Sequence, residues 1–331
     1  MLLSIGPLTP KNGGTCIPTQ LFHKYLTSKK ISYLSVDSSG MVSQKKYIHL
    51  YYEIFKLLKL NETKQCIVHV SNRSLIYLFP YVFVLAVIFR VKIFVRFFGG
   101  NAYDEYKKKY IYRTICNVFV FNSDRFFVET KSLVKNFGRF SNRVVQWPNS
   151  REIYISSKSF SLKHKLPGKY YLFIGTLNES KGAKKLSELA KFSKFPIVFC
   201  GSGPEENFIA KQKNILNLGD VDNIYIEELI RKSIAVILPT NYFGEGHPGC
   251  LVESIKCGTP FIAFDKGGIL DLSFDDSCKV LKQGDWATLT DLLSSGIFEN
   301  HNKILKKELT KKVDYKIIHK EILKVVSLYN E

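Results

Sequence analysis

Residues 245–254 read EGHPGCLVES, a stretch in which two glutamates flank a Gly-His-Pro-Gly loop at the start of an apolar run. Proline and glycine do not belong inside a helix, because proline removes a backbone hydrogen bond and glycine weakens helical order. The stretch therefore predicts a loop in which bare backbone comes close to a ligand. We expect a helix to begin near Gly249, with the ligand over its first turn.

The expected helix would offer amide groups to an anion. If it starts at Gly249, the amides of Gly249, Cys250 and Leu251 are among its unpaired first-turn donors. They suit a diphosphate, and the helix dipole adds about 0.3–1 kcal/mol per charge. Glu253, one turn later, can present both carboxylate oxygens to a vicinal diol such as a ribose. Glu245 lies on the other side of the loop, toward whatever the diphosphate carries. Diphosphate, ribose and a third group together describe a nucleotide-sugar.

Strands alternate with helices along both halves of the chain. In the first half the runs expected as strands are LLSI (2–5), ISYLSV (31–36), CIVHV (66–70), KIFVRFF (92–98), VFVF (118–121), FFVE (126–129) and RVVQ (143–146). In the second half they are YYLFIG (170–175), PIVFCG (196–201), ILNLG (215–219), AVILP (235–239) and PFIAF (260–264), the last closing the sheet. This alternation predicts parallel βαβ units covered on both faces. We predict an α/β protein of two doubly wound, Rossmann-like domains facing a cleft.

The length of 331 residues suits two domains, since one domain typically has about 150 residues. We assign residues 1–150 to an N-terminal domain, 151–168 to a Ser/Lys-rich linker and 169–312 to a C-terminal domain. A final helix within 313–331 is expected to cross back to the N-terminal domain.

Positive charge is concentrated in the first half. Residues 1–165 contain 26 Lys/Arg and 8 Asp/Glu, whereas residues 166–331 contain 22 and 21. The asymmetry favours an anionic partner for the N-terminal domain, and we expect this partner to be an anionic membrane surface. Nucleic acid is disfavoured, because the sequence has no RNP-like strand, C2H2 spacing or basic zipper.

Cysteine spacing and the N-terminus predict a cytoplasmic protein. The seven cysteines are scattered without CxxC spacing, which favours reduced thiols and argues against a zinc site. No basic region precedes LLSI, so no secretory signal is expected. The apolar run Leu75–Phe89 is shorter than the ~20 residues a spanning helix needs. We expect a helix buried against the sheet, with a segment that dips into the membrane as the alternative.

Three further strand-to-helix turns are candidate ligand contacts. TPKNGGT (9–15) places Gly13 and Gly14 before a helix, where an anion is favoured. In GTLNESKGAKKL (175–186) Lys181 can reach a phosphate. In CGSGPEEN (200–207) Gly203 admits close backbone approach, but the full GxGxxG pattern is missing, so a dinucleotide cofactor is not indicated.

These turns, taken together, resemble one enzyme family. YFGEGHPGCLVESIKCGTPFIAF (242–264) is similar to the Glu-x7-Glu signature of GT-B glycosyltransferases of the retaining family 4. FIGTLNESKG (173–182), FCGSGPEE (199–206), WPNS (147–150) and NGGT (12–15) resemble its other turns. The resemblance covers nearly the whole chain and is strongest from about 171 to 271.

The resemblance implies roles for individual residues. Lys181 would bind the donor diphosphate, Glu253 the ribose and Glu245 the donor sugar, while Gly13 and Gly14 would close over the phosphates. It also implies that neither a metal nor a cofactor is required, the nucleotide-sugar being a substrate.

Two positions depart from the family pattern. The family commonly has an arginine where this chain has Thr176, so one diphosphate-binding cation is missing. The histidine often found in the N-terminal domain is also absent, since His69 lies within an expected strand. Two roles are open for His247: it reaches the donor sugar, or it only shapes the loop.

The expected activity is therefore retaining transfer of a sugar from a nucleotide-sugar to a lipid-diphosphate-linked or other glycan acceptor. This suits biosynthesis of a surface polysaccharide such as an O-antigen or capsule, on the cytoplasmic face of the inner membrane. The alternatives are a non-catalytic GT-B-fold protein that binds nucleotide-sugars, a sugar-nucleotide epimerase and a basic nucleic-acid-binding protein.

Overall fold

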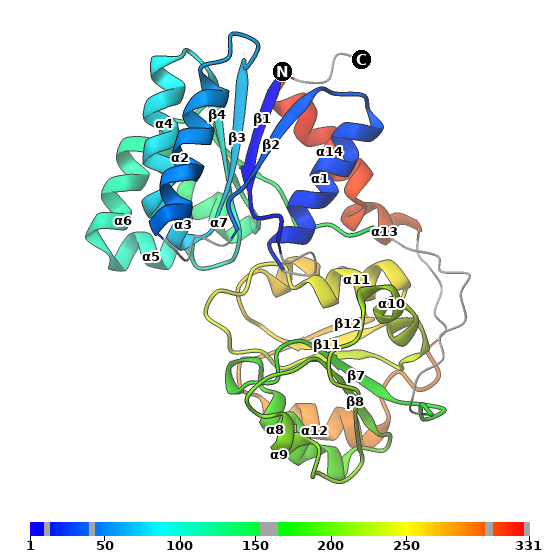
Figure 1. Cartoon of the computed structure of the whole chain (residues 1–331). Coiled ribbons are helices and arrows are strands. Elements are labelled where there is room, and N and C mark those ends of the chain that lie inside the picture. The colour runs from blue at the N-terminus through cyan, green and yellow to red at the C-terminus, as the bar shows by residue number, and fades with distance from the viewer. Residues whose placement is uncertain (10–13, 40–43, 153–164, 302–306, 328–331) are drawn as a thin grey trace. The chain divides into compact units, whose positions relative to one another are not determined.

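The computed structural model describes residues 1–9, 14–39, 44–152, 165–301 and 307–327 (Figure 1). The chain divides into two compact units. Unit 1 comprises residues 1–150 and 315–331, and unit 2 comprises residues 151–314. Each unit is built on one parallel sheet of six strands with helices packed on it. The predicted α/β fold of two doubly wound domains is confirmed.

The sheet of unit 1 has the strand order β2-β1-β3-β4-β5-β6. Its strands are β1 (Leu2–Gly6), β2 (Tyr33–Asp37), β3 (Gln65–Val70), β4 (Lys92–Phe97), β5 (Arg125–Val128) and β6 (Val144–Gln146). One face is covered by α1 (Cys16–Ser28) and α14 (Tyr315–Val325). The other is covered by α2 (Gln44–Leu58), α3 (Asn72–Tyr77), α4 (Phe79–Ile88), α5 (Ala102–Lys108), α6 (Tyr110–Ile115) and α7 (Lys131–Phe137).

Neighbouring residues of the unit 1 strands serve opposite faces. Leu2 and Ile67 belong to the core beneath α1 and α14, whereas Leu3 and Val68 belong to the core on the other side. Side chains alternate between the two faces of a strand, so a strand that is covered on both faces must be apolar throughout. This explains why CIVHV and LLSI do not alternate apolar with polar residues, and why the one polar side chain in each, His69 or Ser4, is also buried.

The sheet of unit 2 has the order β12-β11-β10-β7-β8-β9. Its strands are β7 (Tyr171–Ile174), β8 (Ile197–Cys200), β9 (Ile215–Asn217), β10 (Val236–Leu238), β11 (Phe261–Phe264) and β12 (Cys278–Leu281). Helices α10 (Asn223–Lys232), α11 (Gly249–Cys257) and α13 (Lys307–Val313) pack together, while α8 (Ala183–Leu189), α9 (Glu206–Ile209) and α12 (Trp286–Ser295) lie on the other side (Figure 1).

Strand order places a switch point in each sheet. In unit 2 the chain leaves β7 toward β8 and leaves β10 toward β11, so the connections diverge between two neighbouring strands. In unit 1 the equivalent neighbours are β1 and β3. Ligands of such sheets bind outside the carboxyl ends of the strands at this point. The turns that follow β7 and β10 are therefore the place to look for a site in unit 2.

Two strand predictions are wrong. VFVF (118–121) is not a strand, because α6 continues into one turn of π-helix, Cys116–Val120, whose Cys116 and Val120 are buried. Short apolar runs do not distinguish a strand from a buried helical turn. PFIAF does not close the second sheet either, since β12 pairs in parallel with it.

One helix prediction needs correction. The apolar run Leu75–Phe89 forms two helices instead of one, α3 and α4, which break at Leu78. No helix in the described part of the chain is long and apolar enough to cross a membrane.

Candidate functional site

The turn after β7 fixes the position of Lys181. The Asn178 side chain accepts a hydrogen bond from the backbone N–H of Lys181 at 3.0 Å and another from the Ser180 hydroxyl at 3.0 Å. Gly182 follows with φ +73°, and a Cβ at this position would collide with the carbonyl oxygen of Pro239. The turn is therefore locked by side-chain hydrogen bonds on one side and by a required glycine on the other.

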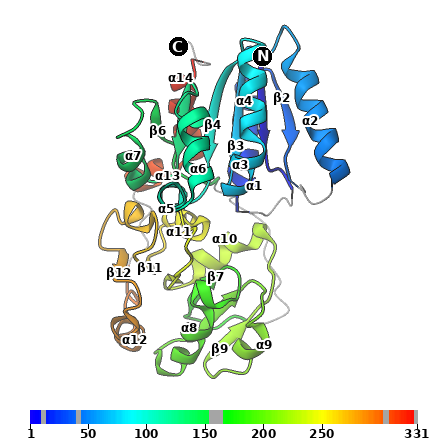
Figure 2. The same cartoon turned by 90° about the vertical axis from the view of Figure 1, so that its left-hand side faces the viewer.

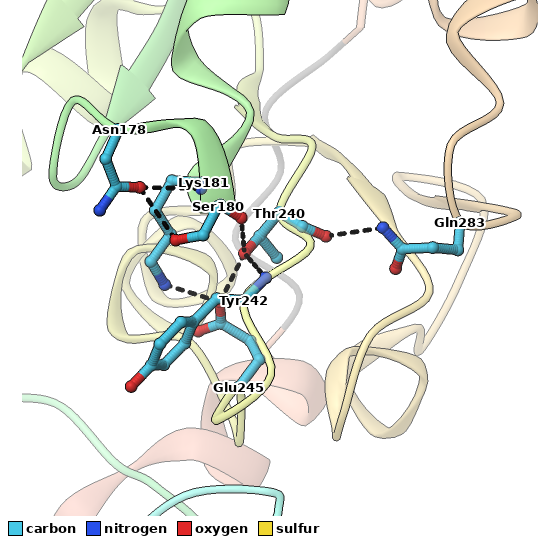
Figure 3. Close-up of polar contacts among 7 residues, drawn as sticks. All are labelled: Asn178, Ser180, Lys181, Thr240, Tyr242, Glu245 and Gln283. Carbon is cyan, nitrogen blue, oxygen red and sulfur yellow. Dashed lines mark hydrogen bonds and ion pairs between the residues drawn. The ribbon is translucent and has the colours of Figure 1, made fainter. Parts of the chain in front are cut away.

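Lys181 is paired with Glu245 (Figure 3). The Lys181 Nζ lies 2.6 Å from Glu245 Oε2, and the Thr240 hydroxyl donates to the same oxygen at 2.8 Å. The Glu245 side chain is 7% exposed and the Lys181 side chain 20%. The ammonium also lies 4.8 Å from the centre of the Tyr242 ring. A nearly buried carboxylate thus holds a lysine that solvent still reaches, and charge-assisted hydrogen bonds of this kind are strong.

Backbone contacts join the turn after β7 to the loop after β10. The Asn241 N–H donates to the carbonyl oxygen of Ser180 at 2.7 Å. Gln283, which follows β12, donates from Nε2 to the carbonyl oxygen of Thr240 at 3.2 Å (Figure 3). Three strand ends therefore hold this loop, and together they fix the Lys181–Glu245 pair.

The loop that carries Glu245 is packed closely on the chain that follows β11. Gly267 has φ +60°, and a Cβ there would collide with the carbonyl oxygen of Glu245. His247 is buried, and its Nε2 lies 3.1 Å from Asp271 Oδ2. The structure thus places His247 against Asp271, where it shapes the loop.

Helix α11 begins at Gly249, as the sequence predicts. One expected donor is already used, because the Leu251 N–H bonds to the carbonyl oxygen of Pro248 at 3.1 Å, so the prediction of an unpaired amide is wrong for Leu251. The Leu251 side chain is buried in the unit 2 core. Burial raises the pKa of the Cys250 thiol to about 12, which keeps it uncharged at neutral pH.

A second ion pair runs along α11. The Arg151 Nε lies 2.9 Å from Glu253 Oε1, with the arginine side chain 7% exposed and the glutamate 28%. A Cβ at Gly249 would collide with the Arg151 guanidinium, so this glycine makes room for the arginine. Lys256 donates to the Arg151 carbonyl oxygen. Burial raises the pKa of the Glu253 carboxyl, and the nearby Arg151 opposes that shift.

Sequence reasoning missed Arg151. The residue is 102 positions away from Glu253 along the chain, and no local pattern joins the two. One signal in the sequence pointed to a close neighbour. Glycine is a poor helix former, so a glycine at the first position of α11 suggests that another group, here the Arg151 side chain, needs the space.

Both ion pairs lie close enough to Cys250 to act on its thiol. Lys181, Glu245, Arg151 and Glu253 all act electrostatically on the thiol of Cys250, at the start of α11. The pairs are neutral in sum, and they bring two cations to the N-terminal end of a helix, where an anion is favoured.

The remaining predicted residues have other surroundings. Gly203 has φ +158°, and a Cβ there would collide with the backbone of Leu177, so the turn after β8 packs on the turn after β7. Thr176 is exposed. Gly14 is exposed in unit 1 just before α1, and Gly13 lies outside the described residues. Within the described ranges, no group of three or more His, Cys, Asp and Glu side chains could hold a metal ion.

The site can now be compared with known proteins. Residues 155–311 match the sequence model of the family described as Glycosyl transferases group 1. The D-rhamnosyltransferase WbpZ of Pseudomonas aeruginosa is 24% identical over 172 residues, which span 47% of this chain and 45% of that protein.

Solved structures are similar over the whole chain. HepE of Anabaena, in complex with UDP, has a TM-score of 0.72 at 12% identity and covers 99% of this chain and 100% of its own. The lipopolysaccharide outer core galactosyltransferase WaaB has a TM-score of 0.68 at 13% identity and covers 99% of each chain. These likenesses show the GT-B fold. The matched residues 155–311 lie within unit 2, the unit that holds both ion pairs.

Proposed function

We propose that the protein is a retaining glycosyltransferase of family 4 that uses a nucleotide-sugar donor. One observation carries the proposal: the Lys181–Glu245 pair lies at the switch point of unit 2, inside the segment that matches group 1 glycosyl transferases. HepE, whose structure contains UDP, supports a nucleoside diphosphate as the common part of the donor.

The donor would bind along the start of α11. Its diphosphate would lie against Lys181 and the first amides of the helix, those of Gly249 and Cys250. The ribose would bind Glu253, whose carboxylate is part-exposed and already fixed by Arg151. The sugar would lie toward Glu245. Negative phosphates are stabilised here by the helix N-terminus and by a lysine that solvent reaches.

In the transfer step the bond between the sugar and the diphosphate breaks while the acceptor hydroxyl attacks on the same face. The leaving phosphate oxygen takes the charge and helps remove the acceptor proton. Lys181 would stabilise that charge, an electrostatic contribution that is large in most enzymes. Before the donor binds, Glu245 neutralises Lys181, so we expect the incoming diphosphate to draw the ammonium away from this carboxylate. The residues proposed here perform the step without a metal or a cofactor.

Arg151 would compensate for Thr176. The family arginine expected after the first strand of this domain is absent, and Thr176 offers no charge. Arg151 brings a guanidinium to the first turn of α11 instead, against Gly249. We assign it the role of second cation near the diphosphate.

The acceptor would be a lipid-diphosphate-linked or other glycan, in the assembly of a surface polysaccharide. WbpZ is a D-rhamnosyltransferase and WaaB a lipopolysaccharide galactosyltransferase, which supports this class of product. The 26 Lys/Arg against 8 Asp/Glu of residues 1–165 support a peripheral position on the cytoplasmic face of the inner membrane.

A second candidate function is a non-catalytic protein that binds nucleotide-sugars. Thr176 favours it, since the site lacks one expected cation, and so does the pairing of Lys181 and Arg151 with carboxylates.

A thermal-shift panel followed by an activity assay tests the proposal. UDP, GDP, ADP and their common sugar conjugates are added to wild-type protein and to Glu253→Ala. We expect one base to stabilise the wild type and to lose this effect in the variant. Slow hydrolysis of the conjugate, or transfer to a glycan acceptor, then indicates an enzyme. Binding without turnover would favour the second candidate, and no shift with any nucleotide would contradict both.

A further inference from the structure

Helix α4 lacks the polar face that a surface helix needs. Its sequence, FPYVFVLAVI, contains no charged residue. Val84, Val87 and Ile88 follow the spacing of one helix face and are 47%, 61% and 63% exposed. The opposite face is buried in the unit 1 core. A helix that is apolar all round is normally buried on all sides. In α4 the outer face stays exposed, so it calls for a partner that the described part of unit 1 does not supply.

The neighbouring helices extend the uncovered surface. Phe55 of α2 contacts Phe89 with ring centres 5.7 Å apart, and Phe83 of α4 contacts Phe119 at 5.6 Å, so α2 and the π-helical turn flank α4. Figure 2 shows α6, α4 and α2 along one side of unit 1. Together they present exposed apolar residues that we call the apolar face: Tyr52, Phe55, Val84, Val87, Ile88, Tyr110, Ile111 and Val118.

Basic residues border the apolar face. Arg90 and Lys92 directly follow α4, Lys56 and Lys59 lie at the end of α2, and all four are exposed. The segment before α6 adds Lys107–Lys109, of which Lys107 and Lys109 are paired with Asp104 and Glu105. Exposed apolar side chains with a basic border are the composition of protein surfaces that lie in the interface of an anionic bilayer.

We propose that the apolar face inserts into the headgroup region of an anionic lipid bilayer, with Arg90, Lys92, Lys56 and Lys59 contacting lipid phosphates. The contact is interfacial, because no described helix is long enough to span a membrane. This inference deepens the proposed function and rests on it in one respect: a lipid-linked acceptor would present its glycan at that same surface.

Charge distinguishes a bilayer from a second copy of the chain. A dimer formed through the apolar face would bring two basic borders together, and like charges repel. An anionic bilayer attracts the same border, because the negative potential at its surface favours lysine and arginine side chains close to the headgroups. The apolar face and its basic border therefore suit an anionic bilayer better than a second copy of the chain.

Sedimentation with vesicles tests the inference. Wild-type protein is mixed with vesicles of phosphatidylcholine, with and without phosphatidylglycerol, and compared with the triple variant Val84→Ser/Val87→Ser/Ile88→Ser. We expect strong binding to phosphatidylglycerol vesicles and a loss of about tenfold or more in the triple variant, since each buried methylene contributes to partitioning. The double variant Ile224→Ser/Leu270→Ser, which removes residues 50% and 60% exposed in unit 2, is the matched control and should bind like wild type.

A border variant separates the two contributions. Arg90→Gln/Lys92→Gln should bind phosphatidylglycerol vesicles more weakly and respond less to added salt, while keeping its nucleotide thermal shift. Retained near-UV circular dichroism confirms that each variant is folded. Vesicle binding by the triple variant equal to wild type would overturn the inference. So would a wild-type dimer that becomes monomeric in the triple variant.

The proposed function is tested separately by donor hydrolysis without vesicles. Hydrolysis that persists in a protein lacking vesicle binding leaves the proposed function standing and rejects only the membrane surface. Vesicle binding by a protein that binds no nucleotide would leave the membrane surface standing and reject the proposed function.

Discussion

Unit 1 and unit 2 share one architecture but carry different residues beside their switch points. Unit 2 brings Lys181, Glu245, Arg151 and Glu253 to the ends of β7 and β10 and the start of α11. In unit 1, β3 contributes His69, which is fully buried among aromatic rings. A parallel sheet provides the crevice, but the polar residues at the strand ends decide whether it becomes a site.

The surfaces differ as well. Unit 1 holds most of the positive charge excess and the apolar face, whereas residues 166–331 are nearly neutral. We therefore propose that unit 2 recognises the donor and that unit 1 contacts an anionic surface. The following predictions test this division, beginning with the largest expected effect.

Lys181→Met should lower the transfer rate by about 10²–10³-fold, the usual effect of removing one group that stabilises transition-state charge. The rate is measured with the donor found by thermal shift. Lys185→Met, which changes a lysine 53% exposed on α8, serves as control and should leave the rate unchanged. A Lys181→Met enzyme as fast as the control would mean that unit 2 does not carry the chemistry at this pair.

Glu253→Ala should weaken binding of the nucleoside diphosphate by about tenfold or more, since hydrogen bonds to a charged group are worth about 1.5–3 kcal/mol each. Calorimetry measures the affinity. Glu228→Ala, which removes a carboxylate that is 30% exposed and paired with Lys232 on α10, is the matched control. Unchanged affinity in Glu253→Ala would remove the ribose assignment and leave Glu253 as a partner of Arg151 alone.

Acid should destabilise unit 1 before unit 2. Burial lowers the pKa of His69 and of His319 well below the ordinary value and that of His23 to about 4. The unfolded chain therefore binds more protons than the folded unit below pH ~6.5, and stability falls with decreasing pH by up to about 1.4 kcal/mol per pH unit for each histidine. Hydrogen exchange followed from pH 7 to pH 5 should show unit 1 opening first.

His319→Phe sharpens this test. The His319 ring packs among Phe22, Tyr25, Trp147 and Tyr315, and a phenyl ring is close to it in size. The variant should reduce the pH dependence of unit 1 by about one proton. An unchanged pH dependence would show that this histidine does not contribute.

Thr176→Arg should strengthen nucleoside diphosphate binding by about two- to fivefold, the range expected for one added exposed charge pair. Thr176→Gln controls for side-chain size. Equal affinities in both variants would mean that Arg151 already supplies the charge the site can use.

The sequence predicts the layered fold well, because strands buried on both faces are read directly from apolar runs. The prediction fails where an apolar run is not a strand, and where a strand is not an apolar run. The run 118–121 is apolar because the turn packs against α4, and β12 shows a half-buried Lys279 in its centre instead of an apolar run. Local patterns do not contain these tertiary contacts.

Part of the candidate site could also be predicted from the sequence. Lys181 and Glu245 follow adjacent parallel strands, so topology alone brings them near each other. Arg151 could not be found in this way, because its pairing with Glu253 depends on how the chain enters unit 2. Gly203 was predicted as a ligand contact from its turn, and the structure adds a packing reason, the close approach to Leu177. The binding roles of these residues stay predictions.

The most direct test of the central claim is hydrogen exchange with and without the nucleoside diphosphate that stabilises the protein. If the donor binds at the switch point of unit 2, residues 176–182 and 241–253 should exchange more slowly in the complex, while α2 and α4 of unit 1 are unaffected. A bound nucleotide that leaves both segments of unit 2 exchanging as in the free protein would contradict the account.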